Sequence, residues 1–284
     1  MIFAVCGGDG RLVRLAGLLL ADGHAVRAWA LEDAPLAEGV RLCESAAECC
    51  AGADCAALPM PLLDSSGFLN APYSAKKRCL TELAEAVGPG TRVFAGGANA
   101  AARAEFSRPP RDYAASEAFR ALNSLATAEG AIAVLLRESE ETLCGKRAVI
   151  TGAGRITGAL APRLAALGLR VTVASRSPAK RAWYAALGFD TADTASLSGA
   201  LVGAEIVVNT APGLVLGAAR LVELPAGAIV LDLASAPGGV DFDAARAFGI
   251  HALTAPGLPG KCAPLTAAKA LRDAIYSGLE DEKL

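Results

Sequence analysis

The sequence predicts an α/β protein with two doubly wound parallel-sheet domains. Residues 2–30 and 147–174 share one order of hydrophobic strand, glycine-rich turn, apolar helix and second strand. This order is typical of parallel strands joined by a right-handed helical crossover. The length of 284 residues agrees with two domains, because a single core stops growing at roughly 250–300 residues. With 53% hydrophobic and 20% charged residues, the chain can bury such cores and is not disordered.

The first domain is expected to span residues 1–121 and to contain four strands. Their predicted ranges are 2–6, 25–30, 53–58 and 91–95. Asp9 can cap the helix after the first strand, and Gly23 ends that helix. A long loop rich in Pro, Ser and Gly follows the third strand, and loops of more than about 12–15 residues are usually functional or disordered. Open α/β sheets bind ligands at the carboxyl ends of their strands, so this loop indicates a ligand site.

The second domain is expected at residues 122–265. A helix over 125–138 leads into it, and Thr127 can cap that helix. The predicted strands of this domain are 147–151, 170–174, 205–209, 228–232 and 251–253. A last helix over 266–284 is expected to return and pack on the first domain.

A glycine turn opens the second domain between a hydrophobic strand and a helix. Its glycines allow a close approach to a pyrophosphate, and the N–H groups and dipole of the following helix favour phosphates. In this context the turn predicts an NAD(P)-binding Rossmann fold. The expected contacts are Gly152, Ala153, Gly154, Arg155 and Ile156. Thr157 stands where the third glycine of the usual pattern is expected, and Pro162 inside the helix predicts a kink.

The end of the next strand indicates which dinucleotide binds. An acidic residue there would accept the ribose 2′-hydroxyl of NAD and repel the 2′-phosphate of NADP. Ser175, Arg176 and Ser177 occupy this place, and Lys180 follows within one turn. Hydroxyl and guanidinium groups suit a phosphate, so the sequence favours NADP over NAD. A solvated surface role for Arg176 would leave the preference weak.

Three later loops rich in glycine and proline complete the predicted cofactor site. Each follows a strand of the same sheet, and loops at strand ends commonly carry binding residues. Their expected contacts are Thr210, Ala211, Pro212, Leu233, Ala234, Ser235, Pro256 and Gly257.

Composition argues against several other classes of protein. The net charge of −2 and the lack of a basic block argue against nucleic acid as a partner. The apolar run at 15–20 is too short to span a bilayer, and no signal peptide is expected. The eight cysteines form no C-x-x-C pair, so no metal is expected and the thiols should be reduced and buried. Cys262 is the alternative candidate, as a catalytic thiol.

Several of these motifs together resemble the family of dipicolinate synthase A subunits. They include CGGDGRL at 6–12, NSLATAEGAI at 123–132, GAGRITGALA at 152–161 and NTAPGLVL at 209–216. The segment LDLASAPGGVDFDAARAFGIHALTAPGLPGKCAPLTA at 231–267 extends the resemblance along nearly the whole chain.

This resemblance implies an activity that composition and spacing do not. It implies NADP-dependent oxidation of dihydrodipicolinate, or its hydrated precursor, to pyridine-2,6-dicarboxylate during sporulation. It also implies that the partner is the flavoprotein-like B subunit of dipicolinate synthase, and that the location is cytoplasmic, in the mother cell. The first domain would then be a flavodoxin- or Rossmann-like substrate domain. We further expect a homo-oligomer.

A dicarboxylate substrate needs cationic or N–H-rich partners. Arg11, after the turn at Gly8 and Asp9, is the first choice, although an exposed structural arginine is an equal alternative. The expected substrate contacts are Gly8, Asp9, Arg11, Asn123, Thr127 and Lys261. The candidate catalytic residues are Asp9, Thr127 and Glu129. His24 and His251 are expected to have structural roles, and Asp232 can brace its own loop. The proton that leaves the ring can be accepted by water, so a protein base is not required.

Two other readings stay open from the residues. One is an NADP-dependent dehydrogenase of another small carboxylate. The other is a non-catalytic nucleotide-binding subunit of a two-subunit complex, which the scarcity of histidine keeps in view.

Overall fold

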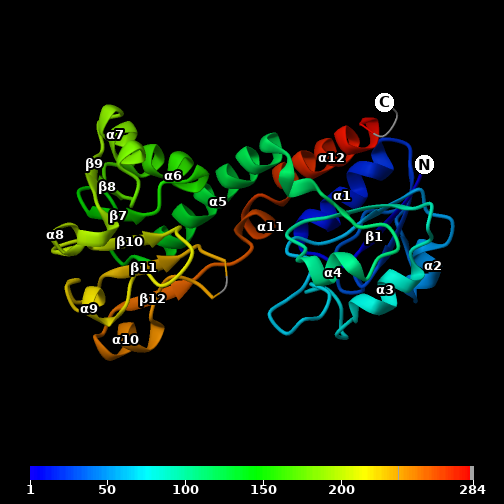
Figure 1. Ribbon diagram of the computed structural model, residues 1–284, viewed down its shortest axis with the longest axis horizontal. Coiled ribbons are helices and arrows are strands. Elements are labelled where there is room, and N and C mark those ends of the chain that lie inside the picture. Colours follow the sequence, from blue (N-terminus) through cyan, green and yellow to red (C-terminus); the bar gives the residue numbers. More distant parts are fainter. Residues whose placement is uncertain (236, 282–284) are drawn as a thin grey trace. The chain divides into compact units, whose positions relative to one another are not determined.

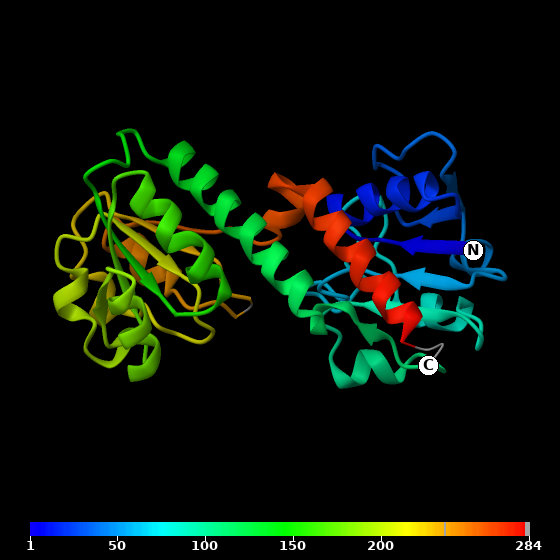
Figure 2. The same ribbon diagram turned by 90° about the horizontal axis from the view of Figure 1, so that it is seen from above.

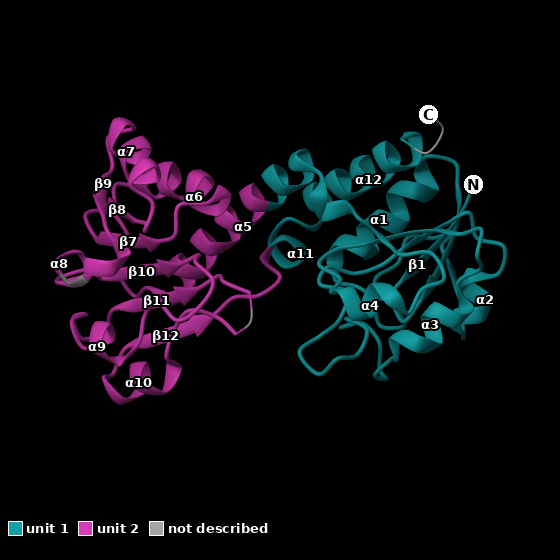
Figure 3. Cartoon of the chain, in the orientation of Figure 1, with its two compact units in different colours: residues 1–123, 259–284 teal, residues 124–258 magenta. Residues whose placement is uncertain are grey.

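The structure, a computed structural model that describes residues 1–235 and 237–281, contains two compact units, each with its own six-stranded parallel sheet (Figures 1 and 3). Unit 1 comprises Met1–Asn123 and the chain from Pro259 onward, and unit 2 comprises Ser124–Leu258. Helices cover both faces of each sheet, so the predicted fold class is confirmed.

The sheet of unit 1 has the strand order β3-β2-β1-β4-β5-β6. All its strands are parallel, and the chain connections run toward opposite edges of the sheet on either side of the β1–β4 pair. Its strands are β1 Ile2–Cys6, β2 Ala25–Trp29, β3 Arg41–Leu42, β4 Cys55–Ala57, β5 Arg92–Ala95 and β6 Arg111–Asp112. Its helices are α1 Gly10–Ala21, α2 Ala46–Cys50, α3 Leu80–Ala86, α4 Ala100–Ala104, the 3-10 turn η1 Tyr113–Ala115, α11 Leu258–Cys262 and α12 Pro264–Glu280. The edge strands β3 and β6 were not predicted, because two residues carry no recognisable periodicity.

Helix α12 belongs to the core of unit 1 and packs across α1 (Figure 2). Leu271 and Ile275 are fully or almost fully buried against the sheet. The Tyr276 hydroxyl donates to Asp22 at the end of α1 over 2.7 Å and lies 3.0 Å from Nε2 of His24. The described part of α12 ends at Glu280, and residues 282–284 of the predicted helix lie outside the described residues.

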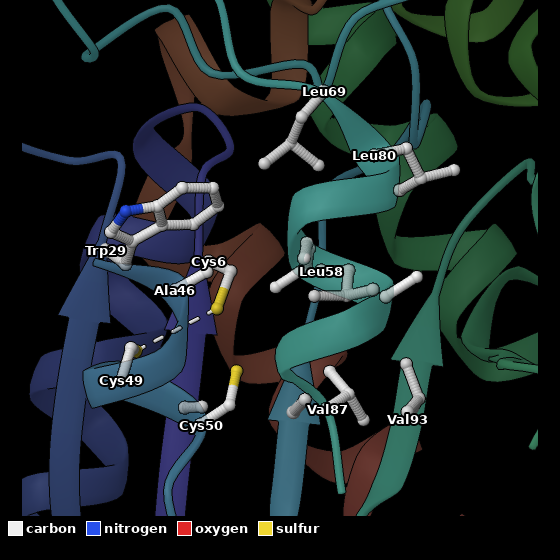
Figure 4. Packing of buried hydrophobic residues seen from close by; sticks show 14 of the residues in the cluster. Cys6, Trp29, Ala46, Cys49, Cys50, Leu58, Leu69, Leu80, Val87 and Val93 are labelled. Carbon is white, nitrogen blue, oxygen red and sulfur yellow. Dashed lines mark hydrogen bonds between the residues drawn. The ribbon is translucent and has the colours of Figure 1, made fainter. Parts of the chain in front are cut away.

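The other face of the unit 1 sheet is packed with cysteines (Figure 4). Cys6 from β1 and Cys49 from α2 bring their sulfur atoms to 3.9 Å, and Cys50 lies beside them. Hydrogen bonding with Cys49 and Cys50, together with burial, raises the pKa of Cys6 well above its usual value. Five cysteines are buried, as expected, but the expectation is wrong for Cys79, Cys144 and Cys262, which are exposed.

The sheet of unit 2 has the strand order β12-β11-β10-β7-β8-β9. Its strands are also parallel, and the chain connections switch toward the other edge of the sheet between β7 and β10. Its strands are β7 Arg147–Thr151, β8 Arg170–Ala174, β9 Asp190–Ala192, β10 Ile206–Asn209, β11 Ile229–Asp232 and β12 His251–Thr254. Its helices are α5 Glu117–Glu138, α6 Arg155–Ala166, α7 Pro178–Ala186, α8 Ser198–Leu201, α9 Ala218–Leu221 and α10 Phe242–Ala247, with the 3-10 turn η2 Thr194–Ser196. The edge strand β9 was not predicted.

Helix α5 begins at Glu117, well before the predicted start at residue 125. Ser116 caps it, because its hydroxyl accepts a hydrogen bond from the N–H of Phe119. Thr127 therefore lies inside the helix, and its predicted capping role is wrong. The chain passes from unit 1 to unit 2 within α5, between residues 123 and 124 rather than at the expected 121.

Within the described residues, α5 is long and apolar enough to cross a membrane by length and composition, and 44% of that apolar window is buried. Core helices of globular proteins have the same properties. Ala131 and Leu135 of α5 are fully buried in the core of unit 2.

Candidate functional site

A cavity of about 830 Å³ lies at the carboxyl ends of β7, β8, β9 and β10. Open α/β sheets bind their ligands at this edge, and the volume suits a large organic ligand. The described residues that line it are Gly152, Ala153, Gly154, Ser175, Arg176, Ser177, Lys180, Thr194, Ala195, Thr210, Ala211, Pro212, Gly213, Leu214, Val215 and Arg220. All of them belong to unit 2.

The turn between β7 and α6 forms one wall of the cavity. Gly152 has a φ of +102°, and a Cβ there would overlap Oγ1 of Thr210 and crowd the N–H of Ala211, so this position requires glycine. Gly154 is the N-cap of α6 and offers no side chain to the first turn. The N–H groups and positive dipole end of α6 can therefore serve an anion.

Thr157 replaces the third glycine of the usual pattern and is fully buried. Its hydroxyl donates to the Gly152 carbonyl over 2.9 Å and lies 3.1 Å from Oγ1 of Thr210. The threonine thus ties the glycine turn to the loop after β10. Helix α6 continues through Pro162 to Ala166.

The predicted selectivity residues surround the end of β8. The hydroxyl of Ser175 accepts from the N–H of Ser177, and the hydroxyl of Ser177 caps α7 by accepting from the N–H of Lys180. Both serines therefore shape the turn and keep a hydroxyl hydrogen to donate. Among the described residues, no carboxylate lies within ion-pair distance of Arg176 or Lys180. Arg181, which does not line the cavity, pairs with Asp193 at 3.0 Å.

The sequence-based prediction missed the wall that follows β9. Because β9 was not predicted, the loop after it was not considered. The lining residues without a prediction are Thr194, Ala195, Gly213, Leu214, Val215 and Arg220. The three-residue run Asp190–Ala192, directly before Asp193 and Thr194, is the sequence signal that could have found this loop.

A buried polar chain joins the three central strands under these loops. The Thr151 hydroxyl donates to Asn209 over 2.6 Å, and the Asn209 amide donates to Asp232 over 2.8 Å. The Asp232 carboxylate also accepts from the N–H groups of Ala234 and Gly239, at 3.0 and 2.7 Å. Asp232 thus braces the loop after β11, which is the structural role considered for it from the sequence.

Several predicted cofactor contacts do not line this cavity. Arg155 and Ile156 form the first turn of α6. The others follow β11 and β12 at the same edge of the sheet, and they are Leu233, Ala234, Ser235, Pro256 and Gly257. Their contact with a cofactor stays a prediction.

The predicted substrate residues of unit 1 meet at the start of α1. Arg11 is only 4% exposed, so it is not the exposed surface arginine of the alternative reading. Its Nε and Nη2 donate to the Asp9 carboxylate at 2.9 Å, and Nη2 also donates to the Met60 carbonyl. Among the described residues Nη1 has no acceptor, which leaves its two N–H bonds for a ligand. Gly8, with a φ of +94°, turns the chain toward this pair.

The segment around Gly260 packs on this turn within unit 1. A Cβ at Gly260 would overlap the Asp9 carboxylate, and a Cβ at Gly10 would overlap the Gly260 carbonyl. The next residue, Lys261, is exposed. Asn123 is half-buried in α5 at the end of the unit.

The remaining catalytic candidates lie in unit 2. Thr127 is buried in α5, and Glu129 is exposed and pairs with Arg163 at 3.8 Å. His24 contacts Tyr276 in unit 1, and His251 contacts Glu138 at 3.0 Å in unit 2. Each histidine is next to or at the first residue of a strand, away from the carboxyl ends. Within the described residues, no group of three His, Cys, Asp or Glu side chains could hold a metal ion.

Comparison with known proteins gives this arrangement a family context. The model of the N-terminal domain of the dipicolinate synthase A subunit matches residues 2–112. The chain is 37% identical over 153 residues to the dipicolinate synthase A subunit of Bacillus subtilis strain 168, a match that covers 54% of this chain and 52% of the relative. That match therefore spans about half the length of the relative.

Solved structures extend the comparison to nearly the whole chain. The crystal structure of the dipicolinate synthase A subunit from Bacillus halodurans has a TM-score of 0.88 and 27% identity, covering 98% of this chain and 97% of that one. The resemblance to dipicolinate synthase A subunits is confirmed.

Two further solved structures of this fold are more distant relatives. The transhydrogenase from Sinorhizobium meliloti has a TM-score of 0.70 at 17% identity and covers 99% of this chain and 94% of that one. An L-alanine dehydrogenase has a TM-score of 0.65 at 14% identity and covers 98% of this chain and 89% of that one. At these identities the comparison shows a shared fold alone.

Proposed function

We propose that this chain is the oxidoreductase subunit of a dipicolinate synthase. It oxidises dihydrodipicolinate, or its hydrated precursor, to pyridine-2,6-dicarboxylate during sporulation. NADP would supply the hydride acceptor, and a proton from the ring would leave to water or to a protein base. The products would be NADPH and the aromatic dicarboxylate, with one water also lost where the hydrated precursor is the substrate. The partner is the flavoprotein-like B subunit, and the site of action is the cytoplasm of the mother cell. The similarity to relatives named as A subunits of dipicolinate synthase supports this proposal.

The charge of the cavity is the observation that carries the cofactor assignment. The described lining contains three cationic side chains, Arg176, Lys180 and Arg220, and no Asp or Glu. Arg176 and Lys180 are exposed and Arg220 is half-buried, so an anion entering the cavity would meet three cations and no competing carboxylate. NADP supplies a pyrophosphate for the glycine turn and a 2′-phosphate for the end of β8.

The substrate assignment rests on the turn in unit 1. The free Nη1 of Arg11 is suited to one carboxylate of the ring, with Lys261 and Asn123 as further polar contacts. The N–H group of Gly8 already donates to the Asn70 carbonyl over 2.8 Å, so Gly8 contributes the turn rather than a donor. The pair with Asp9 fixes the orientation of the guanidinium, which lowers the entropy lost on binding.

The first experiment measures affinity and turnover with both dinucleotides. Wild-type protein should bind NADP more tightly than NAD, and Arg176→Asp should lower the affinity for NADP at least about tenfold. A charge-assisted hydrogen bond contributes about 1.5–3 kcal/mol, and about 1.4 kcal/mol corresponds to a tenfold change in affinity. Arg170→Asp reverses a charge at the opposite end of the same strand, β8, and should leave the affinity unchanged. Equal affinity of wild-type protein for NAD and NADP would contradict the cofactor assignment.

One observation favours a second candidate, a nucleotide-binding subunit without chemistry of its own. Both acidic candidates, Asp9 and Glu129, are paired with arginines, and both histidines are engaged elsewhere. NADPH formation from dihydrodipicolinate by this chain alone would exclude this candidate. Formation only in the presence of the partner would support it.

A further inference from the structure

Arg220 joins two loops on different sides of the nucleotide cavity. From α9 its Nη1 donates to the Val215 carbonyl over 2.6 Å, and its Nη2 donates to the Thr194 carbonyl over 2.6 Å. Val215 belongs to the loop after β10, and Thr194 begins the turn after β9. These strands are not neighbours, because β7 and β8 lie between them. A single side chain thus sets the spacing of two walls of the cavity.

The charge of Arg220 is not neutralised by the protein. Among the described residues, its hydrogen-bond partners are two backbone carbonyls, and no carboxylate lies within ion-pair distance. Arg246, on the next helix α10, contrasts with it, because that arginine faces Asp243 at 3.4 Å and does not line the cavity. A guanidinium that is fixed by carbonyls and left cationic is suited to an anionic ligand.

The strand order locates the effect of Arg220 within the cavity. Strand β9 pairs with β8, so Thr194 stands beside the end of β8, where Ser175 and Arg176 line the cavity. The loop after β10 is also fixed on its other side, because the N–H groups of Val215 and Leu216 donate to the Gly239 carbonyl. Among these loops, the turn after β9 depends on Arg220 for its tie to the loop after β10.

We propose that Arg220 is a positioning residue for the adenosine half of the dinucleotide. It holds the turn after β9 at a fixed distance from the loop after β10, so that the adenosine and its phosphates enter a site of preset width. This inference rests on the proposed function, because it assumes that a dinucleotide fills the cavity. Arg220 differs in role from Arg176, since it acts on the walls common to NAD and NADP.

The test compares Arg220→Met and Arg220→Lys with wild-type protein by calorimetry, using adenosine 2′,5′-bisphosphate, NADP and NAD as ligands. Arg220→Met should lower the affinity for adenosine bisphosphate and for both dinucleotides by at least about tenfold. The reason is the loss of the two charge-assisted hydrogen bonds that join the turn after β9 to the loop after β10. Arg220→Lys keeps the charge on a single nitrogen and should recover part of the loss. Arg246→Met removes an exposed arginine from the same unit and should change nothing.

Kinetics separate positioning from a general loss of structure. The KM for NADP should rise in Arg220→Met, while kcat at saturating NADP stays within about twofold, because the chemistry lies at the other end of the dinucleotide. Wild-type affinity in Arg220→Met, or a loss restricted to NADP, would overturn the proposal. If wild-type protein binds neither dinucleotide, the proposed function falls as well. If the Arg220 variants bind the dinucleotides as tightly as wild-type protein does, only the inference about Arg220 is wrong.

Discussion

At the scale of single residues, Gly152 is the position where the backbone geometry and the proposed cofactor binding both depend on the absence of a Cβ atom. Its φ of +102° is strained for any residue with a Cβ, and the added methyl of Gly152→Ala would overlap the Thr210 hydroxyl. We expect this substitution to destabilise unit 2 by about 1–3 kcal/mol and to abolish measurable NADP binding. Denaturant unfolding and calorimetric titration measure the two effects.

Gly188 provides the matched control for this prediction. It has a similar φ of +88°, but nothing lies within 4 Å of its missing Cβ. Gly188→Ala should therefore show only the backbone cost, about 1–2 kcal/mol, with NADP affinity unchanged. Normal binding by Gly152→Ala would mean that the turn does not approach the pyrophosphate.

At the scale of elements, the sequence was most informative where a strand is buried on both faces. Central strands such as β7 and β10 are continuous apolar runs, and their predicted ranges differ from the observed bounds by at most one residue. The two- and three-residue edge strands have no such run. Because β9 was not predicted, the loop after it was not considered, and the role of Arg220 in holding that loop was missed. Long-range hydrogen bonds such as those of Arg220 depend on which strands become neighbours, which local patterns do not specify.

The docking of α12 on α1 is an element-scale contact with a pH dependence. The Tyr276 hydroxyl donates to Asp22, and burial together with this hydrogen bond raises the pKa of Tyr276. The pKa of Tyr276 is higher in the folded state than its unfolded value of about 10. The contact therefore contributes its full stabilisation below about pH 10, and this contribution is lost as the pH rises further. Tyr276→Phe should lower the free energy of unfolding by about 1 kcal/mol at neutral pH. The difference from wild type should shrink above about pH 10.

Urea unfolding at several pH values measures this difference, and Tyr73→Phe is its control. Tyr73 packs on the same core, and its hydroxyl has no hydrogen bond among the described residues. A wild-type advantage over Tyr276→Phe that grows at alkaline pH would reverse the sign of the argument.

At the scale of the whole molecule, the chain carries two cores that can respond separately to ligand. Unit 1 and unit 2 have separate sheets and separate clusters of buried side chains. The cavity lies within unit 2, so under the proposed function NADP should stabilise that unit by mass action, by about 2.7 kcal/mol at a free concentration of about 100 times Kd. Calorimetric scans should show two transitions, of which NADP raises one.

The two tryptophans identify which transition moves. Trp29 is fully buried in unit 1, whereas Trp183 on α7 of unit 2 is 64% exposed. In Trp183→Phe, fluorescence reports unit 1 alone, because the chain has only two tryptophans. We expect NADP to leave the unfolding midpoint of unit 1, reported by Trp29 fluorescence, unchanged. NADP should raise the temperature of the calorimetric transition that belongs to unit 2. An equal rise in the Trp29 midpoint and in the calorimetric transition would show that the two units unfold as one cooperative body. NADP binding would then also stabilise the turn at Asp9 and Arg11.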